Sequence, residues 1–200
     1  MHTNQILLYA DSGMLADVTD LYDDDTYSHY SDISIANTQG SDGRMYGVPK
    51  DKDTVCLVYN KEMFDQAGVA YPDENWTWDD LTEASQKIYD ATGKYGYMAY
   101  CDEQLGYWNF VYQNGGYILN EDKTAAGFDN QATIDAMKFY IGLQDNEWCP
   151  DQTYFAETAP GNAFFSEQGA TIIGLLVLNY YPLIQTFILS FSKTKTFGAS

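Results

Sequence analysis

The chain has 200 residues, enough to bury a substantial core, and this length corresponds to one or two domains. Its 29 acidic side chains against 10 basic ones give a formal net charge of −19, which argues against nucleic-acid binding because phosphate backbones are repelled. A hydrophobic content of 45% indicates a folded chain rather than a disordered one. The 18 tyrosines suit either a core or a surface that holds sugars and other amphipathic ligands.

Metal binding and catalysis find little support in the sequence. Cys56, Cys101 and Cys149 lack the spacing of a zinc site and are interpreted as small buried hydrophobic residues. The run Asp23-Asp24-Asp25 could supply calcium ligands, but it lacks the alternate spacing and the distal glutamate of a calcium loop. Motifs of serine hydrolases and nucleotide-binding folds are absent, and no carboxylate pair is marked as that of a glycosidase. We therefore predict that the protein is not an enzyme and needs no cofactor or metal.

Strands and helices alternate along the first third of the chain. The aspartate-rich residues 21–32 are predicted to form a polar loop, and residues 43–49 a short extended segment closed by a proline. The apolar, β-branched run at 54–60 is typical of a buried strand. A brief helix should follow at 61–67 and end at Gly68.

The clearest helix signals lie between residues 76 and 93. Thr77 is a suitable N-cap, acidic residues follow in the first turn, and Gly93 should end the helix. The predicted buried stripe consists of Leu81, Ala84, Ile88 and Ala91.

A second strand at 95–101, a helix at 104–114 that ends before two glycines, and a hairpin at 117–128 complete the middle of the chain. A further helix within residues 130–146 places one set of side chains along one side: Ile134, Met137, Tyr140, Ile141 and Gln144. This alternation predicts an α/β fold of packed layers.

Several stretches, in unbroken order, resemble a known family: YGVPKDKDTVCLVYNKEMFDQAG, WTWDDLTEASQKI, the aromatic helix leading to Gly115-Gly116, FDNQATIDAMKFY and FFSEQGATIIG. Over roughly residues 1–174 the chain resembles the family 1 extracellular solute-binding proteins, the maltose-binding-protein-like sugar receptors of bacterial ABC importers. The resemblance implies a type II periplasmic-binding-protein-like fold, in which two α/β lobes close over a ligand by a hinge motion. It also implies a sugar or oligosaccharide ligand, importer membrane subunits as partners, and a location in the periplasm or at the extracellular face of the membrane.

The resemblance also affects how the start of the chain is interpreted. In that family the segment matched by MHTNQ lies well inside the protein, and MHTNQILLYADSG lacks the basic region and the apolar core of a signal peptide. We therefore expect an N-terminally truncated, incomplete two-lobe fold. Residues 1–54 would be a remnant of the first lobe and the hinge crossover, and residues 55–173 the second α/β lobe.

The end of the chain differs from everything before it. Residues 168–192 carry no charge, and the resemblance to the receptor stops at Gly174, where the family soon places a sugar-stacking tryptophan. NYYPLIQTFILSF instead resembles the first membrane helix of a sugar ABC permease, and the segment from Ile172 to Phe191 has the length of a bilayer span. We predict an apolar helix here, with residues 174–200 as a permease-like transmembrane segment and tail. A final buried helix of the lobe is the alternative.

The resemblance implies six ligand-binding residues: Thr3, Asn4, Asp53, Glu103, Tyr107 and Trp108. The first two match a first-lobe segment that hydrogen-bonds sugar hydroxyls, Asp53 matches a hinge carboxylate, and the last three match the loop and helix start that face the ligand. Such a set suits a pyranose, which has an apolar face for aromatic rings and a rim of hydroxyls for carboxylates and amides. Core packing is the alternative for Trp108, and a plain surface charge for Asp53.

A carbohydrate receptor is therefore the predicted function. The alternatives are a nonfunctional, membrane-tethered fusion fragment and, less favoured, a secreted glycosidase.

Overall fold

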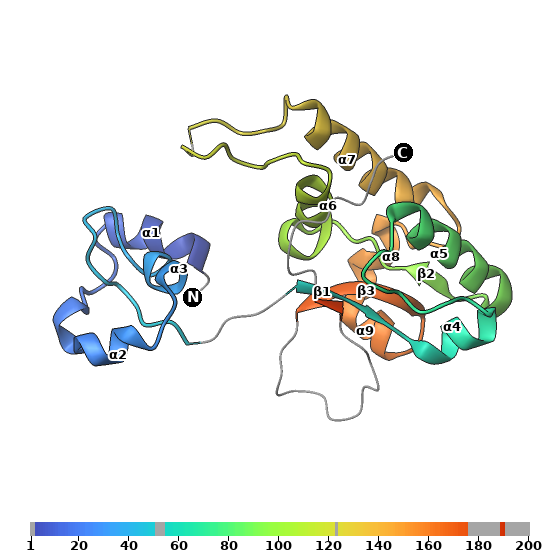
Figure 1. The fold of residues 1–200 in the computed structure, drawn as a ribbon, viewed down its shortest axis with the longest axis horizontal. Helices are drawn as coiled ribbons and strands as arrows, with labels where there is room; N and C mark the ends of the chain where they lie inside the picture. The colour runs from blue at the N-terminus through green and yellow to red at the C-terminus, as the bar shows by residue number, and fades with distance from the viewer. Residues whose placement is uncertain (1–2, 51–54, 123, 176–188, 191–200) are drawn as a thin grey trace. The chain divides into compact units, whose positions relative to one another are not determined.

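The structure is a computed structural model that describes residues 3–50, 55–122, 124–175 and 189–190 (Figure 1). The chain forms two compact units, Met1–Asp53 and Thr54–Ser200.

The first unit is built from short helices around a small core. Its elements are α1 (Thr3–Asp11), a 3-10 turn η1 (Thr19–Leu21), α2 (Asp24–Ser28) and α3 (Asp32–Ala36). An antiparallel bridge between Gln39 and Met45 follows α3. The buried side chains include Ile6, Ala10, Thr38 and Met45.

The predicted loop at 21–32 is wrong, because α2 and the start of α3 lie within it. Asp23 caps α2: its Oδ1 accepts hydrogen bonds from the Thr26 hydroxyl at 2.7 Å and from the Thr26 backbone N–H at 2.9 Å. These bonds, the hydroxyl first, lower the pKa of the Asp23 carboxyl. The acidic run therefore begins a helix. Among the described residues, no group of three or more His, Cys, Asp or Glu side chains could hold a metal ion.

The second unit contains a four-stranded mixed sheet, formed by β1 (Val55–Tyr59), β2 (Tyr95–Tyr97), β3 (Gly169–Leu175) and β4 (Leu189–Ser190). The strand order is β2-β3-β1-β4; β2 and β3 are parallel, and β1 is antiparallel to both β3 and β4. The register pairs Leu57 with Ile173 and Tyr97 with Thr171. The carboxyl ends of β2 and β3 consequently lie at the same end of the sheet as the amino end of β1. This end is called the carboxyl edge below.

Helices cover both faces of this sheet (Figure 1). On one face lie α4 (Lys61–Ala67), α5 (Trp78–Thr92), α6 (Trp108–Gln113), α7 (Gln131–Gly142) and the 3-10 turn η3 (Leu143–Asp145). On the other face lie α8 (Gln152–Glu157) and α9 (Pro160–Phe165). The layered α/β fold predicted from the sequence is confirmed for this unit.

Helix α5 begins and ends where the sequence predicts. Thr77 and Asp80 form a capping box, in which each side chain bonds the backbone N–H of the other residue, and Gly93 ends the helix in the left-handed conformation, at φ 66°. Of the predicted stripe, Ala91 is exposed and Ser85 is buried instead. The buried face thus follows positions 81, 84, 85 and 88 and stops one turn before the helix ends.

The side chains predicted to share one side of the helix at 130–146 differ in burial. Tyr140 is buried, whereas Ile141 is 61% exposed and Thr133 and Ala136 occupy the core positions. The hydroxyl of Thr133 donates to the carbonyl of Tyr117 at 3.1 Å, and this bond holds a polar side chain at the inner face. The predicted hairpin at 117–128 is reduced to one bridge, between Leu119 and Ala126.

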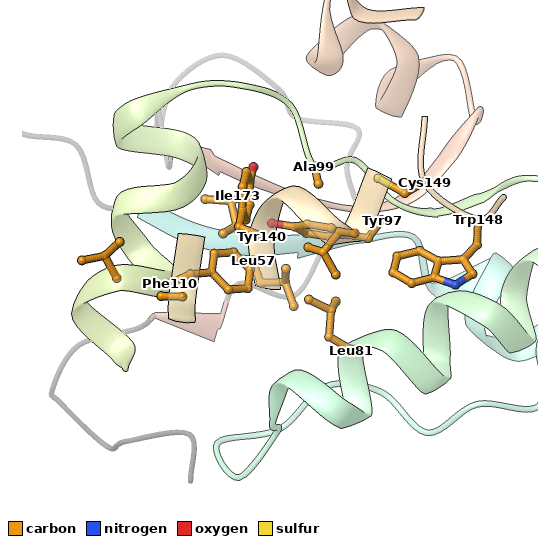
Figure 2. Close-up of a cluster of buried hydrophobic side chains, with 12 residues drawn as sticks. Leu57, Leu81, Tyr97, Ala99, Phe110, Tyr140, Trp148, Cys149 and Ile173 are labelled. Carbon is orange, nitrogen blue, oxygen red and sulfur yellow. The ribbon is translucent and has the colours of Figure 1, made fainter. Parts of the chain in front are cut away.

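The largest buried cluster lies between the sheet and helices α5, α6 and α7 (Figure 2). Leu57, Tyr97 and Ile173 come from the sheet, and Phe110 and Tyr140 pack against them from the helices. The Phe110 and Tyr140 ring centroids are 4.9 Å apart.

Two of the three cysteines are buried, as predicted, and one is exposed. Cys56 and Cys149 lie in the interior, whereas Cys101 is at the surface. Burial raises the pKa of the Cys149 thiol to about 12, so this side chain stays protonated and behaves as a small hydrophobic residue.

The apolar helix predicted from Ile172 to Phe191 is corrected at both of its ends. Residues up to Leu175 continue strand β3, and Leu189 and Ser190 form β4, which pairs with Leu57 and Cys56 of β1. Residues 176–188 lie outside the described part of the chain. Within the described ranges, none of the helices has the length and apolar character needed to cross a membrane.

Candidate functional site

The candidate site lies where the chain leaves β2 at the carboxyl edge of the sheet. In open α/β sheets, ligands bind outside the carboxyl ends of the strands. Residues 98–102 cross this edge, and they lead into a π-helical turn, η2 (Glu103–Tyr107), and then into α6.

Two side chains from α7 and η3 hold the backbone of this crossing segment. The Tyr140 hydroxyl donates to the carbonyl of Tyr100 at 2.8 Å, and Gln144 Nε2 donates to the carbonyl of Ala99. Burial raises the pKa values of the Tyr140 and Tyr100 hydroxyls well above the ordinary range, so both stay protonated. The segment is therefore fixed to the core by hydrogen bonds from a part of the chain some 40 residues further on.

Two polar side chains that flank the turn hydrogen-bond to its backbone. Asp102 Oδ1 accepts a hydrogen bond from the backbone N–H of Leu105 at 2.6 Å. Asn109 Nδ2 donates to the carbonyls of Gln104 at 2.7 Å and Gly106 at 3.1 Å. These contacts define the positions of the residues between them.

The helix predicted at 104–114 is wrong as a single element, because Gly106 interrupts it. Its backbone has non-helical angles of φ −127° and ψ −118°, and α6 proper begins at Trp108. A Cβ atom on Gly106 would lie 2.9 Å from the Tyr140 hydroxyl oxygen and 3.0 Å from the Tyr100 carbonyl oxygen. The absence of a side chain lets the turn approach the segment that Tyr140 anchors.

Three of the six predicted ligand-binding residues lie on this turn or directly after it. Glu103 is exposed, and Tyr107 and Trp108 are half-buried. Tyr107 packs against the main core cluster. Trp108 occupies the first position of α6. The segment thus carries an exposed carboxylate, which accepts hydrogen bonds from hydroxyls, and two aromatic rings that keep accessible surface.

The other three predicted residues belong to the first unit. Thr3 and Asn4 belong to α1 in the first unit, where their backbone is described. Asp53 lies outside the described residues.

Sequence reasoning missed the residues that position the turn. Asp102 was detectable, since an aspartate directly before a helical stretch is a common N-cap. The role of Gln144 was not, because its bond to the carbonyl of Ala99 joins residues 45 positions apart.

The turn lines none of three cavities formed by described residues of the second unit. Cavities of about 490, 450 and 340 Å³ lie elsewhere on the second unit and are lined by other described residues. Ligand pockets bury most of their ligand, so a ligand held at this turn would need contacts beyond it.

The layered α/β unit places a carboxylate and aromatic side chains at the carboxyl edge of its sheet, where open α/β sheets bind small molecules. The comparison with known families agrees: the chain belongs to the bacterial extracellular solute-binding proteins, whose family model matches residues 3–177.

Curated relatives and solved structures resemble the chain over part of their length. The arabinooligosaccharide-binding protein of Halalkalibacterium halodurans is 32% identical over 107 residues, which cover 54% of this chain and 24% of the relative. An ABC substrate-binding protein from Listeria monocytogenes, solved in complex with cycloalternan, matches with a TM-score of 0.76 at 28% identity, covering 86% of this chain and 45% of that one.

A third relative is the cyclic alpha-maltosyl-1,6-maltose binding protein from Arthrobacter globiformis. It matches with a TM-score of 0.65 at 29% identity over 86% of this chain and 44% of its own. The chain thus spans less than half the length of these proteins. The relatives are substrate-binding proteins.

Proposed function

We propose that the protein is a carbohydrate-binding receptor component of a bacterial ABC sugar importer, with Glu103, Tyr107 and Trp108 as ligand contacts of the second unit. The observation that carries the proposal is the position of these three side chains on a braced turn at the carboxyl edge of the sheet. The arabinooligosaccharide-binding and cyclic-maltosyl-maltose-binding relatives support a saccharide as the ligand class.

Such a receptor binds and releases its ligand and performs no reaction. The ring of Trp108 would stack on the apolar face of a pyranose, and the Glu103 carboxylate would accept hydrogen bonds from hydroxyls on its rim. The membrane subunits of the importer would then receive the ligand from the receptor. Thr3, Asn4 and Asp53 remain proposed contacts from the first unit and the hinge.

Binding by this chain should be weaker than that of a complete two-lobed receptor. The 200-residue chain covers less than half the length of its relatives, so we expect it to make fewer contacts with the ligand and to exclude less water than both lobes together. We expect a Kd above about 1 µM, that is, less than about 8 kcal/mol of binding free energy.

Replacing Trp108 by alanine should weaken saccharide binding at least tenfold, because the stacking surface is lost. Isothermal titration calorimetry of the 200-residue chain with arabino- and malto-oligosaccharides measures the effect. Tyr112→Ala is the matched control, since Tyr112 lies one turn further along α6 and is 54% exposed. Equal binding by the parent chain and the Trp108 variant would show that the turn is not the ligand site.

Membrane attachment by residues 174–200 is a second proposal. It is supported by the uncharged run at 168–192 and by the likeness of the tail to a permease helix. Because β3 and β4 flank residues 176–188, only 13 residues separate the paired strands, fewer than the about 20 that a bilayer span requires. An apolar stretch of about 10–14 residues is more often a buried core segment, or a re-entrant or interfacial segment, than a span.

Detergent-phase partitioning of the full chain and of a chain stopped at Gly174 tests this attachment. We expect the full chain in the detergent phase and the shorter chain in the aqueous phase. Recovery of both chains from the aqueous phase would contradict the attachment, and with it the membrane-tethered fusion fragment as an alternative function.

A further inference from the structure

A polar groove lies at the end of the sheet opposite Glu103, and it consists of two neighbouring cavities that share Lys94 and Gln168. Lys94 and Gln168 stand directly before β2 and β3, and Asn60 directly follows β1. Two neighbouring cavities of about 450 and 340 Å³ share Lys94 and Gln168 as lining residues. We propose that this groove is a second binding site, for a neutral saccharide.

Aromatic side chains line the larger of the two cavities. Tyr89, Tyr95 and Tyr154 come from α5, β2 and α8. The rings of Tyr95 and Tyr154 meet edge to face, with centroids 5.3 Å apart and planes at 70°. Tyrosine rings offer an apolar face and a hydroxyl on the same side chain, which suits the amphipathic surface of a pyranose.

The wall shared by the two cavities carries an oriented donor. Lys94 Nζ donates to Gln168 Oε1 at 3.2 Å, and Gln168 Nε2 donates to the carbonyl of Ser166 at 3.0 Å. The amide of Gln168 is thereby fixed at both ends. An ammonium has three protons, so Lys94 can donate to a ligand hydroxyl while it keeps this bond.

The charges around the groove select the class of ligand. Glu147 lines the larger cavity, Glu62 and Glu167 line the smaller one, and Lys94 is the single basic residue among the described residues that line either. Three carboxylates around one ammonium, in a chain of net charge −19, oppose phosphates and uronates. A neutral polyol satisfies both kinds of group, because each hydroxyl donates and accepts.

The size of the cavities suits a small ligand. Both volumes fall within the about 300–1,000 Å³ typical of small-molecule sites. Since the groove and the turn at Glu103 lie at opposite edges of the sheet, occupation of one does not require the other.

Saturation-transfer-difference NMR on the full chain tests the groove, with maltose, lactose and xylobiose as probes and glucuronate as the anionic comparison. The starting chain carries Glu103→Gln and Trp108→Ala, which remove the proposed receptor contacts. We expect this chain to retain saturation transfer to at least one neutral disaccharide. Lys94→Gln, added to the same chain, should weaken that binding at least fivefold.

Lys138→Gln is the matched control, because Lys138 lines a separate groove between α5 and α7. The Lys138→Gln variant should bind the disaccharide as tightly as the starting chain does. Tyr154→Leu provides a second variant that removes a ring and leaves the charges in place. Circular dichroism establishes whether each variant is folded. If Tyr154→Leu unfolds, the binding measured with Lys94→Gln alone tests the groove. Loss of all saturation transfer in the starting chain, an unchanged Kd with Lys94→Gln, or tighter binding of glucuronate would overturn the proposal.

Discussion

Replacing Phe110 by alanine should lower the free energy of unfolding of the second unit by about 3–5 kcal/mol. The side chain is 3% exposed, and its ring contacts those of Tyr140, at a centroid distance of 4.9 Å, and Trp78, at 5.3 Å. Truncation removes these contacts and leaves a cavity between α6, α7 and the sheet. The close packing of aromatic rings around this position limits how far the site can collapse.

Urea unfolding followed by circular dichroism measures the change, and Tyr112→Ala on the same helix is the control. Tyr112 is exposed, so its truncation should alter the free energy of unfolding by less than about 0.5 kcal/mol. A loss below about 1 kcal/mol for Phe110→Ala would mean that α6 does not pack on the sheet as the structure shows.

Gly96→Ala should destabilise the same unit by about 3 kcal/mol or more. Gly96 lies in β2, where the strand packs directly against α5, and an added Cβ atom would lie 2.2 Å from the Cα and 2.4 Å from the carbonyl oxygen of Ser85. Because these atoms belong to the backbone, no change of rotamer relieves the overlap. The strand and the helix must move apart.

Gly142→Ala is the matched control for this substitution. Gly142 is the last residue of α7, and a Cβ atom there meets nothing within 4 Å. Its φ of −65° is an ordinary helical value, so alanine should raise stability by up to about 1 kcal/mol. Thermal unfolding of the two variants and the parent compares them directly; similar melting temperatures for Gly96→Ala and the parent would contradict the close contact.

The sequence predicted those elements best whose limits are set by neighbouring residues. Asn60 and Gly68 delimit α4, and Thr77 and Gly93 delimit α5, because a capping side chain and a left-handed glycine act within one turn. The aspartates at 23–25 carried a similar capping signal, but their charge favoured the interpretation as a loop.

Features that depend on distant contacts were not predictable in the same way. Periodicity indicates a helix but does not say which turn reaches the core. Ala91 was therefore assigned to a buried stripe and proved exposed, and Ile141, which was placed on one side of its helix with the buried Tyr140, is also exposed. The interruption at Gly106 depends on Tyr140, which is 34 residues away in the sequence.

In the candidate site, too, the features that depend on distant contacts were not predicted. Family resemblance brought out Glu103, Tyr107 and Trp108, whereas residue chemistry alone did not mark them. The hydrogen bonds from Tyr140 and Gln144 that brace the turn emerged only in the folded chain.

The pairing of β1 with β3 has a consequence for how the protein is made. Val55 lies opposite Leu175, so the strand that opens the second unit meets its partner only after some 120 further residues have been synthesised. At about 5–20 residues per second, translation of that stretch lasts on the order of 6–24 s. During this interval the run Val-Cys-Leu-Val-Tyr has both hydrogen-bonding edges free, and unpaired apolar strands offer a template for pairing with other chains. High-yield production of this chain therefore depends on keeping β1 apart from its copies until β3 arrives.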